Sequence, residues 1–116
     1  MIQLIGKTAN GKIFKCDKCS AIHVEFKNMG FNLSEKQFPY FAESILDLDG
    51  NEWETRNKGS YFSRKILIPT GHNTINILLN NQELNELKEL LTDRSGTKVT
   101  FNNISNDNFL IPSFCN

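Results

Sequence analysis

The chain has 116 residues, of which 39% are hydrophobic and 22% are charged, a balance that excludes a disordered chain and predicts one globular domain spanning residues 1–116. Its 13 basic residues are matched by 13 acidic residues, and this zero net charge argues against nucleic acid as a partner, which calls for a basic excess. No apolar run approaches the ~20 residues of a membrane span or has the form of a signal peptide, so we expect no membrane partner and a cytoplasmic location.

Two strands joined by a tight turn are predicted at the start of the chain. Residues 1–5 form a short strand, and residues 12–16 form the strand that returns beside it. Between them lies Asn10-Gly11, the favoured pair for a tight reversal because both central residues of such a turn adopt positive φ. The sequence therefore predicts an antiparallel pair here.

Residues 21–26 form the clearest strand of the sequence. Alternate residues of a strand point to opposite faces, and the apolar set is expected to point into the core. The residues of this core face are Ile22, Val24 and Phe26. His23 and Glu25 share the other face, where we expect solvent, and residues 31–33 are predicted as a third strand.

Helix signals follow these strands. Ser34 and Gln37 have the spacing of a capping box, in which each side chain accepts a hydrogen bond from the backbone N–H of the other residue. We therefore expect a helix from Ser34 to residues 47–51, with Pro39 distorting its first turn or delaying its start. Residues 51–60 are polar and are predicted as a loop.

The second half of the chain repeats this order. Strands are predicted at residues 61–68 and 74–79, and Asn80 with Glu83 forms a second capping box. The helix that follows places leucines on one side at helical spacing. These residues are Leu84, Leu87, Leu90 and Leu91. Residues 93–96 end this helix, with Gly96 as its cap.

The repeated order indicates a duplicated unit. Aligning Ile13 with Ile66 without a gap also aligns Cys19 with His72. A helix with a capping box then follows each hairpin, so the order is ββ(β)α followed by ββα. Unit one covers about residues 12–49, and unit two covers about residues 61–96.

These elements predict an α+β fold. We expect one antiparallel β-sheet with the two α-helices packed on one face. Residues 98–101 are predicted as a last strand. The tail at residues 102–116 still contains apolar residues, so we expect it to dock on the body of the domain.

The cysteine pair with metal-ligand spacing is Cys16-x-x-Cys19, in the predicted turn between two strands. Two thiolates at this spacing bind one tetrahedral zinc ion, which needs two further ligands. His72 is the preferred third ligand because the repeat places it at the position of Cys19. His23 and Cys115 are the other candidates. In the alternative interpretation Cys16 is a core residue and Cys19 a turn residue, with no metal.

A redox dithiol is a further alternative for this pair. Thioredoxin-like motifs place the first cysteine at a helix N-terminus, which lowers its pKa, whereas a strand follows here. Lys15 and Lys18 still favour a thiolate. The chain has three cysteines, and this odd number fits a reducing compartment better than a disulfide framework.

Several motifs occur in a fixed order along the chain. They are Cys16-x-x-Cys19, Ile22-x-Val24-x-Phe26-x-Asn28, a capped helix, a second hairpin and a Leu-rich helix. Over about residues 12–92, this order resembles a family of short, uncharacterised bacterial proteins of the Bacteroidetes with a C-x-x-C hairpin. The resemblance implies a consistent fold and no assigned activity, so no catalytic residue is carried over.

The sequence contains no complete catalytic motif. It lacks a P-loop, a nucleophile elbow, a dinucleotide fingerprint and a zinc-protease motif. We therefore expect a non-enzymatic protein without a cofactor that acts through protein–protein contacts, including a homodimer formed through the sheet face or an edge strand. A zinc-binding module is the alternative, and a thiol redox protein is the less favoured one.

Overall fold

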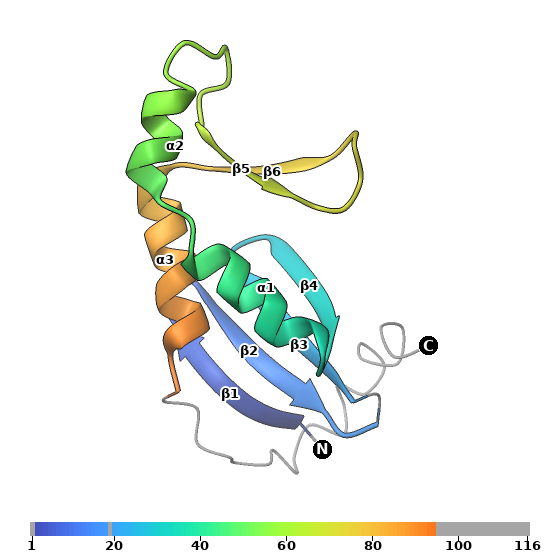
Figure 1. Ribbon diagram of the computed structural model, residues 1–116. Helices are drawn as coiled ribbons and strands as arrows, with labels where there is room; N and C mark the ends of the chain where they lie inside the picture. Colours follow the sequence, from blue (N-terminus) through green and yellow to red (C-terminus); the bar gives the residue numbers. More distant parts are fainter. Residues whose placement is uncertain (1, 19, 95–116) are drawn as a thin grey trace.

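The computed structural model describes residues 2–18 and 20–94 (Figure 1). Within these residues it contains two antiparallel sheets and three α-helices. The elements in chain order are β1 (Ile2–Thr8), β2 (Gly11–Cys16), β3 (Ala21–Phe26), β4 (Met29–Ser34), α1 (Gln37–Leu46), α2 (Gly50–Arg56), β5 (Ile66–Pro69), β6 (Asn76–Leu79) and α3 (Asn81–Thr92). The α+β class is confirmed, and the order of elements matches the predicted repeat apart from α2.

The larger sheet has the strand order β1-β2-β3-β4, so each strand pairs with its neighbour in the sequence. Ala9 and Asn10 form the first turn, between the paired residues Thr8 and Gly11. A glycine is needed at position 11 because a Cβ there would lie 2.0 Å from the carbonyl oxygen of Glu25 on β3. The predicted first hairpin is confirmed, although β1 is longer than residues 1–5. The prediction that Asn10 and Gly11 are the central turn residues with positive φ is wrong, since Gly11 already pairs with Thr8 and neither residue has a positive φ.

Both faces of β3 carry buried residues. Its three apolar residues point into the core, as predicted. His23 lies on the other face, but the expectation that solvent surrounds it is wrong, since its exposed fraction is only 4%. Its Nδ1 lies 2.7 Å from Oδ1 of Asn32 on β4, and its ring stacks on Phe14 of β2 with a centroid distance of 5.0 Å. Glu25, on the same face, is exposed.

α1 follows the predicted capping box. The Ser34 N–H donates to Gln37 Oε1 at 2.9 Å, and the Gln37 N–H donates to Ser34 Oγ at 3.0 Å. The regular helix starts at Gln37, three residues later than predicted. Pro39 therefore lies in the first turn, where its missing N–H removes no helical hydrogen bond.

The prediction of a loop at residues 51–60 is wrong for its first half, where α2 forms a short helix. The Asp49 side chain caps this helix, because its Oδ1 accepts hydrogen bonds from the backbone N–H groups of Asn51 and Glu52 at 3.1 and 3.2 Å. Trp53 packs against the core from the inner side of α2. One cap and one aromatic side chain thus hold a helix in a mostly polar segment.

β5 and β6 form a sheet of their own, so the expected single sheet is corrected to two. Ile66 pairs with Leu79, and Ile68 pairs with Ile77 on the face turned towards the core. Both strands are shorter than predicted, since β5 begins at Ile66 and β6 begins at Asn76. Before Ile66, the side chains of Asn57 and Lys65 donate hydrogen bonds to backbone carbonyls, and these bonds take the place of strand pairing.

α3 contacts both sheets and both other helices. Asn80 and Glu83 form the predicted capping box, with Asn80 Oδ1 2.8 Å from the Glu83 nitrogen and Glu83 Oε1 2.9 Å from the Asn80 nitrogen. The four predicted inward leucines are all buried. The predicted cap at Gly96, the strand at residues 98–101 and the docked tail at residues 102–116 lie outside the described residues.

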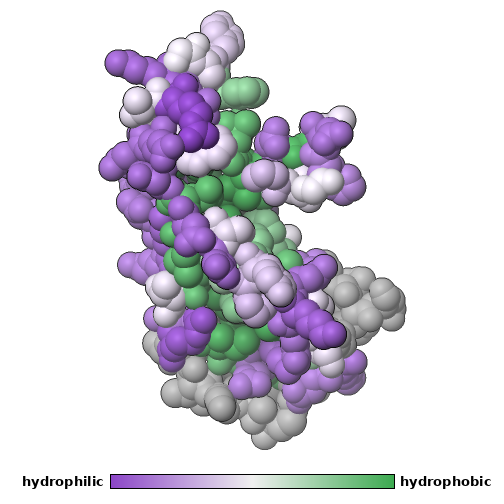
Figure 2. Space-filling model, viewed as in Figure 1, coloured by the Kyte–Doolittle hydropathy of each residue, from purple (hydrophilic) through white to green (hydrophobic). Residues whose placement is uncertain are grey.

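α1 and α3 lie on the same face of the larger sheet, as predicted (Figure 1). One core runs from this face to the β5–β6 hairpin, and Figure 2 shows apolar residues along the middle of the molecule between hydrophilic flanks. Its largest fully buried side chains are Phe26, Ile13, Ile45, Ile66, Leu84, Leu87, Leu90, Leu91 and Val24. Each contributes about 1.5–3 kcal/mol, so this shared core holds the two sheets together.

Candidate functional site

The predicted metal ligands have three different settings. Cys16 is the last residue of β2, and its side chain is only 3% exposed. Cys19 and Cys115 lie outside the described residues. His72 is exposed in the turn between β5 and β6. Figure 1 shows this turn well separated from the end of β2, so the structure does not bring Cys16 and His72 together.

The separation follows from the presence of two sheets. Cys16 ends β2 and Pro69 ends β5, so the predicted equivalence of the two hairpins holds locally. Their turns would meet only if the hairpins were neighbours in one sheet, and they belong to different sheets. Among residues 2–18 and 20–94, no three His, Cys, Asp or Glu side chains gather where they could hold a metal ion. The site of Cys16, Cys19 and His72 stays a prediction.

Cys16 and His23 share the sheet face opposite α1 and α3. The register pairs Phe14 with His23, and Cys16 stands two residues beyond Phe14 on the same face. Because the amide oxygen of Asn32 only accepts hydrogen bonds, His23 Nδ1 is the donor of their 2.7 Å contact. A thiol and an imidazole therefore lie on neighbouring strands, both buried.

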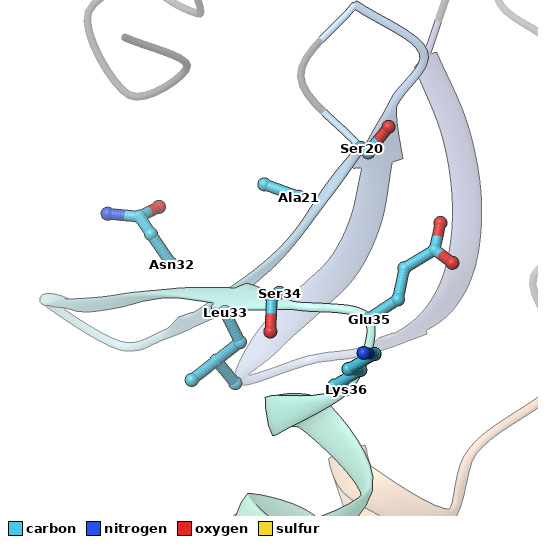
Figure 3. A pocket seen from close by; sticks show the side chains of 7 residues that line it. All are labelled: Ser20, Ala21, Asn32, Leu33, Ser34, Glu35 and Lys36. Carbon is cyan, nitrogen blue, oxygen red and sulfur yellow. The ribbon is translucent and has the colours of Figure 1, made fainter.

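A shallow pocket lies at the start of β3, beside the end of β4 (Figure 3). Ser20 and Ala21 line it from the start of β3, and residues 32–36 line it from the end of β4 and the turn into α1. Three of its polar side chains have partners within the fold. The pairs are Asn32 with His23, Ser34 with Gln37 and Glu35 with Lys15. These groups serve the fold, and none of the described lining residues forms a nucleophile–base pair.

The loop of residues 57–65, which connects α2 to β5, is braced by its own side chains. The Lys65 ammonium donates to the carbonyl oxygen of Ser60 at 2.7 Å and also to that of Phe62. Asn57 Nδ2 donates to the carbonyl oxygen of Lys65 at 2.8 Å. Figure 1 shows the 57–65 loop at the upper end of the molecule, next to α2. Its backbone is thus fixed although no strand includes it.

Two aromatic residues of the 57–65 loop face solvent. Tyr61 is fully exposed, and Phe62 is 54% exposed. The sequence pattern did not predict this exposure, because residues 61–68 were expected to form a strand that starts at Tyr61. The sequence did contain a signal for their exposure. Polar residues flank Tyr61 and Phe62 on both sides, and the segment lacks the apolar alternation of a half-buried strand.

An ion pair joins the 57–65 loop to α3. Arg64 Nε lies 2.7 Å from Glu83 Oε1, and Arg64 Nη2 lies 3.1 Å from Glu83 Oε2. This hydrogen-bonded pair holds the pKa of Glu83 below its usual range and raises the pKa of Arg64. Glu83 also caps α3, so the loop position is tied to the first turn of that helix.

Fold and surface together define a small α+β domain with two exposed aromatic residues on a braced loop. The chain belongs to a family of unknown function, DUF6686, whose model matches residues 1–112. The predicted resemblance to an uncharacterised family is thereby confirmed, whereas its link to the Bacteroidetes and to the C-x-x-C hairpin stays a prediction. No curated protein and no solved structure matches the chain. None of the described helices is long and apolar enough to cross a membrane.

Proposed function

We propose that the protein is a non-enzymatic interaction domain that binds a partner protein through Tyr61 and Phe62. The observation that carries this proposal is the exposure of both aromatic rings on a loop with a fixed backbone. Aromatic side chains bury a large apolar area when a partner covers them. Tyrosine is also enriched among the few residues that contribute most to protein–protein binding.

The bracing of the 57–65 loop supports this role. Ordering a loop on association costs free energy, and a loop that is ordered beforehand avoids much of that cost. The hydrogen bonds from Lys65 and Asn57 are made within the loop, so they do not depend on a partner. The two rings are therefore presented in one backbone arrangement.

The charges around the loop favour a protein over a polyanion. The cations near the two rings are Arg56, Lys58, Arg64 and Lys65. Three of them are already engaged: Arg56 with Glu52, Arg64 with Glu83, and Lys65 with loop carbonyls. A nucleic-acid site needs a basic excess that remains available to phosphates. An apolar pocket on a protein fits the two rings better.

Site-specific photocrosslinking in the native host tests this proposal. A photoreactive phenylalanine analogue replaces Tyr61, and the same analogue replaces Tyr40 in the matched control. Tyr40 is 76% exposed, but it lies on α1, away from the 57–65 loop. We expect a discrete crosslinked protein from position 61 and none from position 40. Adding Phe62→Ser should strongly reduce the yield from position 61.

The same crosslinks at both positions, or no protein crosslink at position 61, would contradict the proposal. Phe62→Ser removes little packing because this side chain is half exposed. An unchanged melting temperature of that variant would show that a lower crosslink yield reflects lost binding.

Zinc binding is a second candidate function, and the placement of His23 favours it. We propose that Cys16 and Cys19 bind zinc together with a histidine. His72 was the predicted ligand, whereas His23 is the histidine that shares the sheet face of Cys16. Its Nδ1 lies 2.7 Å from Asn32 Oδ1, a contact that orients the ring, as is common for histidine ligands of metals. The thiol redox alternative gains less support, because Cys16 is buried.

Elemental analysis of protein purified without a chelator or an affinity tag tests the zinc proposal. We expect about one zinc ion per chain and a loss of zinc in Cys16→Ser. Comparing His23→Gln with His72→Gln identifies the histidine ligand. A zinc content far below one ion per chain, or content unchanged by Cys16→Ser, would rule this function out.

A further inference from the structure

The two edge strands of the larger sheet differ in how they are protected. At the β1 edge the pairing register shifts between Leu4 and Gly6, and the Lys7 N–H donates to Asp93 Oδ2 at 2.9 Å. The carbonyl oxygen of Asp93 lies so close that a Cβ on Gly6 would be 2.6 Å from it. A bulge and a covering helix end are two of the devices that keep edge strands from pairing with other chains.

In the part of the chain that the structure describes, the β4 edge lacks these devices. Its six residues, Met29–Ser34, contain no charged residue and no proline, and they pair with β3 in an unbroken register. Within residues 2–18 and 20–94, no strand other than β3 pairs with β4. A regular, uncharged edge strand is a template for one further strand.

The hydrogen-bonding pattern of β2, β3 and β4 determines which backbone groups of β4 point away from β3. The Lys27 N–H donates to the carbonyl oxygen of Asn10 at 2.8 Å, so the odd-numbered residues of β3 bond to β2 and the even-numbered ones bond to β4. By the β3–β4 register, Gly30, Asn32 and Ser34 then turn their backbone groups outward. The Ser34 N–H already donates to Gln37 Oε1, so within the described part of the chain Gly30 and Asn32 remain to offer both N–H and C=O.

We propose that β4 pairs antiparallel with β4 of a second copy of this chain, around a two-fold axis beside Phe31. Gly30 of each copy then exchanges both backbone hydrogen bonds with Asn32 of the other copy. Phe31 faces Phe31 of the second copy as a non-hydrogen-bonded pair, in which the side chains approach most closely. Met29 faces Leu33 of the second copy.

The side chains of β4 are self-complementary in this register. Met29 meets Leu33 and Phe31 meets Phe31, so every apolar residue of the strand meets an apolar residue. Sliding the strands by one repeat of two residues brings Met29 next to Glu35 in one direction and leaves Leu33 opposite the β3–β4 turn in the other. Apolar matching therefore selects the register in which Gly30 and Asn32 also exchange their hydrogen bonds.

The pairing also extends the existing core. Phe31 packs on Phe41 of α1 with a ring centroid distance of 4.9 Å, so the new pair continues an aromatic layer beneath both α1 helices. The contact consists of one short strand and its side chains, which is small for a protein interface. Interfaces below about 1,200 Å² are mostly weak and transient, so dimerisation is expected to depend on concentration.

Sedimentation velocity of the full chain over a wide concentration range, with proline at the strand edge, tests the dimer. Proline is tolerated where an edge-strand N–H faces outward, but it cannot donate to a second copy. We expect Gly30→Pro to remain monomeric. The matched control Gly30→Ala keeps the N–H, has open space around its Cβ, and is expected to dimerise like the unmodified chain.

A disulfide provides an independent test if Gly30→Pro fails to fold. On mild oxidation Phe31→Cys should form a disulfide-linked dimer, because residue 31 of each copy faces the other as a non-hydrogen-bonded pair. Gly30→Cys is the matched control, since residue 30 faces Asn32 of the second copy, and it should crosslink far less. A monomer at all concentrations, a Gly30→Pro dimer or equal crosslinking of the two cysteine variants would overturn the proposal. Tyr61→Ser leaves this dimer intact, which separates it from partner binding by the 57–65 loop.

Discussion

Glu83 is the residue at which the 57–65 loop and α3 meet. Its carboxylate accepts hydrogen bonds from Arg64 and from the backbone N–H of Asn80. The hydrogen bond from Arg64 is the main reason that its pKa lies below the usual range. A carboxyl group with a lowered pKa in the folded state stabilises the fold when it is ionised.

We therefore predict a pH-dependent effect of Glu83→Gln. The stabilisation by Glu83 is complete above the pKa of the unfolded chain, about 4.3, and is lost as the pH falls through the lower pKa of the folded state. Gln still fits the capping position but loses the ion pair, so the substitution should cost about 0.2–1 kcal/mol at neutral pH. Urea unfolding at several pH values should show this difference shrinking below about pH 4. A difference that stays constant with pH would contradict the assignment.

Gly11 leaves no room for a side chain between β2 and β3. A Cβ at this position would lie 2.0 Å from the Glu25 carbonyl oxygen and 3.0 Å from Leu90 Cδ2. Because backbone has to move to admit it, Gly11→Ala should destabilise the fold by about 1–3 kcal/mol in urea unfolding. Gly30→Ala is the control, since its Cβ meets nothing within 4 Å. Equal stability of the two variants would show that β2 and β3 adjust freely.

At the scale of elements, the sequence predicted the helix starts that depend on interactions between residues close in the chain. Both capping boxes were visible in the sequence, because a cap involves residues only three positions apart. α2 was missed although Asp49 and Glu52 have a similar spacing. The loop prediction gave weight to the polar character of residues 51–60 and not to this start signal.

The Asp49 cap should control the stability of α2. Asp49→Ala removes the acceptor for two N–H groups and is expected to cost about 0.5–2 kcal/mol. Trp53 on this helix is the single tryptophan of the chain, so its fluorescence reports on α2 directly. We expect stronger acrylamide quenching in Asp49→Ala. Asp47→Ala is the control, because α1 uses only the backbone of Asp47 at its end. Identical quenching in both variants would contradict the role of the cap.

The predicted metal site required its ligands to be close in space, and the sequence alone does not give the distances between hairpins. The repeat aligns Cys19 with His72, yet equivalence within a repeat does not make two hairpins neighbours in a sheet. The burial of His23 was missed for a similar reason, since strand alternation assigns a face but not what covers it. The hydrogen bonds of Lys65 to loop carbonyls could not be predicted either, because no periodic pattern reveals a side chain that bonds to nearby backbone.

At the scale of the whole molecule, α3 links the two sheets. Its leucines are buried in the core shared by the larger sheet and the β5–β6 hairpin. Lys27 in the β3–β4 turn also forms an ion pair with Glu86 of α3 at 3.0 Å. The two sheets share no strand pairing, so their coupling depends on this helix and on the core around it.

Leu87→Ala should therefore weaken both sheets together. Truncating a fully buried leucine typically costs about 2–5 kcal/mol, and Leu87 is fully buried. Hydrogen exchange should show reduced protection in β2, β3, β5 and β6 by a similar free energy. Leu46→Ala is the control because Leu46 is exposed on α1, and it should leave protection nearly unchanged. Loss of protection confined to one sheet would show that the sheets unfold separately.

The β5–β6 hairpin ends in a turn in which residues 70–75 are all exposed. Its strands contribute to the core near Ile66 and Leu79, at the end opposite this turn. Lengthening an exposed connection costs little, since closure entropy grows only slowly with length. A fluorescent label or a short peptide graft next to His72 would thus be carried away from the body of the protein, making this turn the natural handle for following the chain inside a cell.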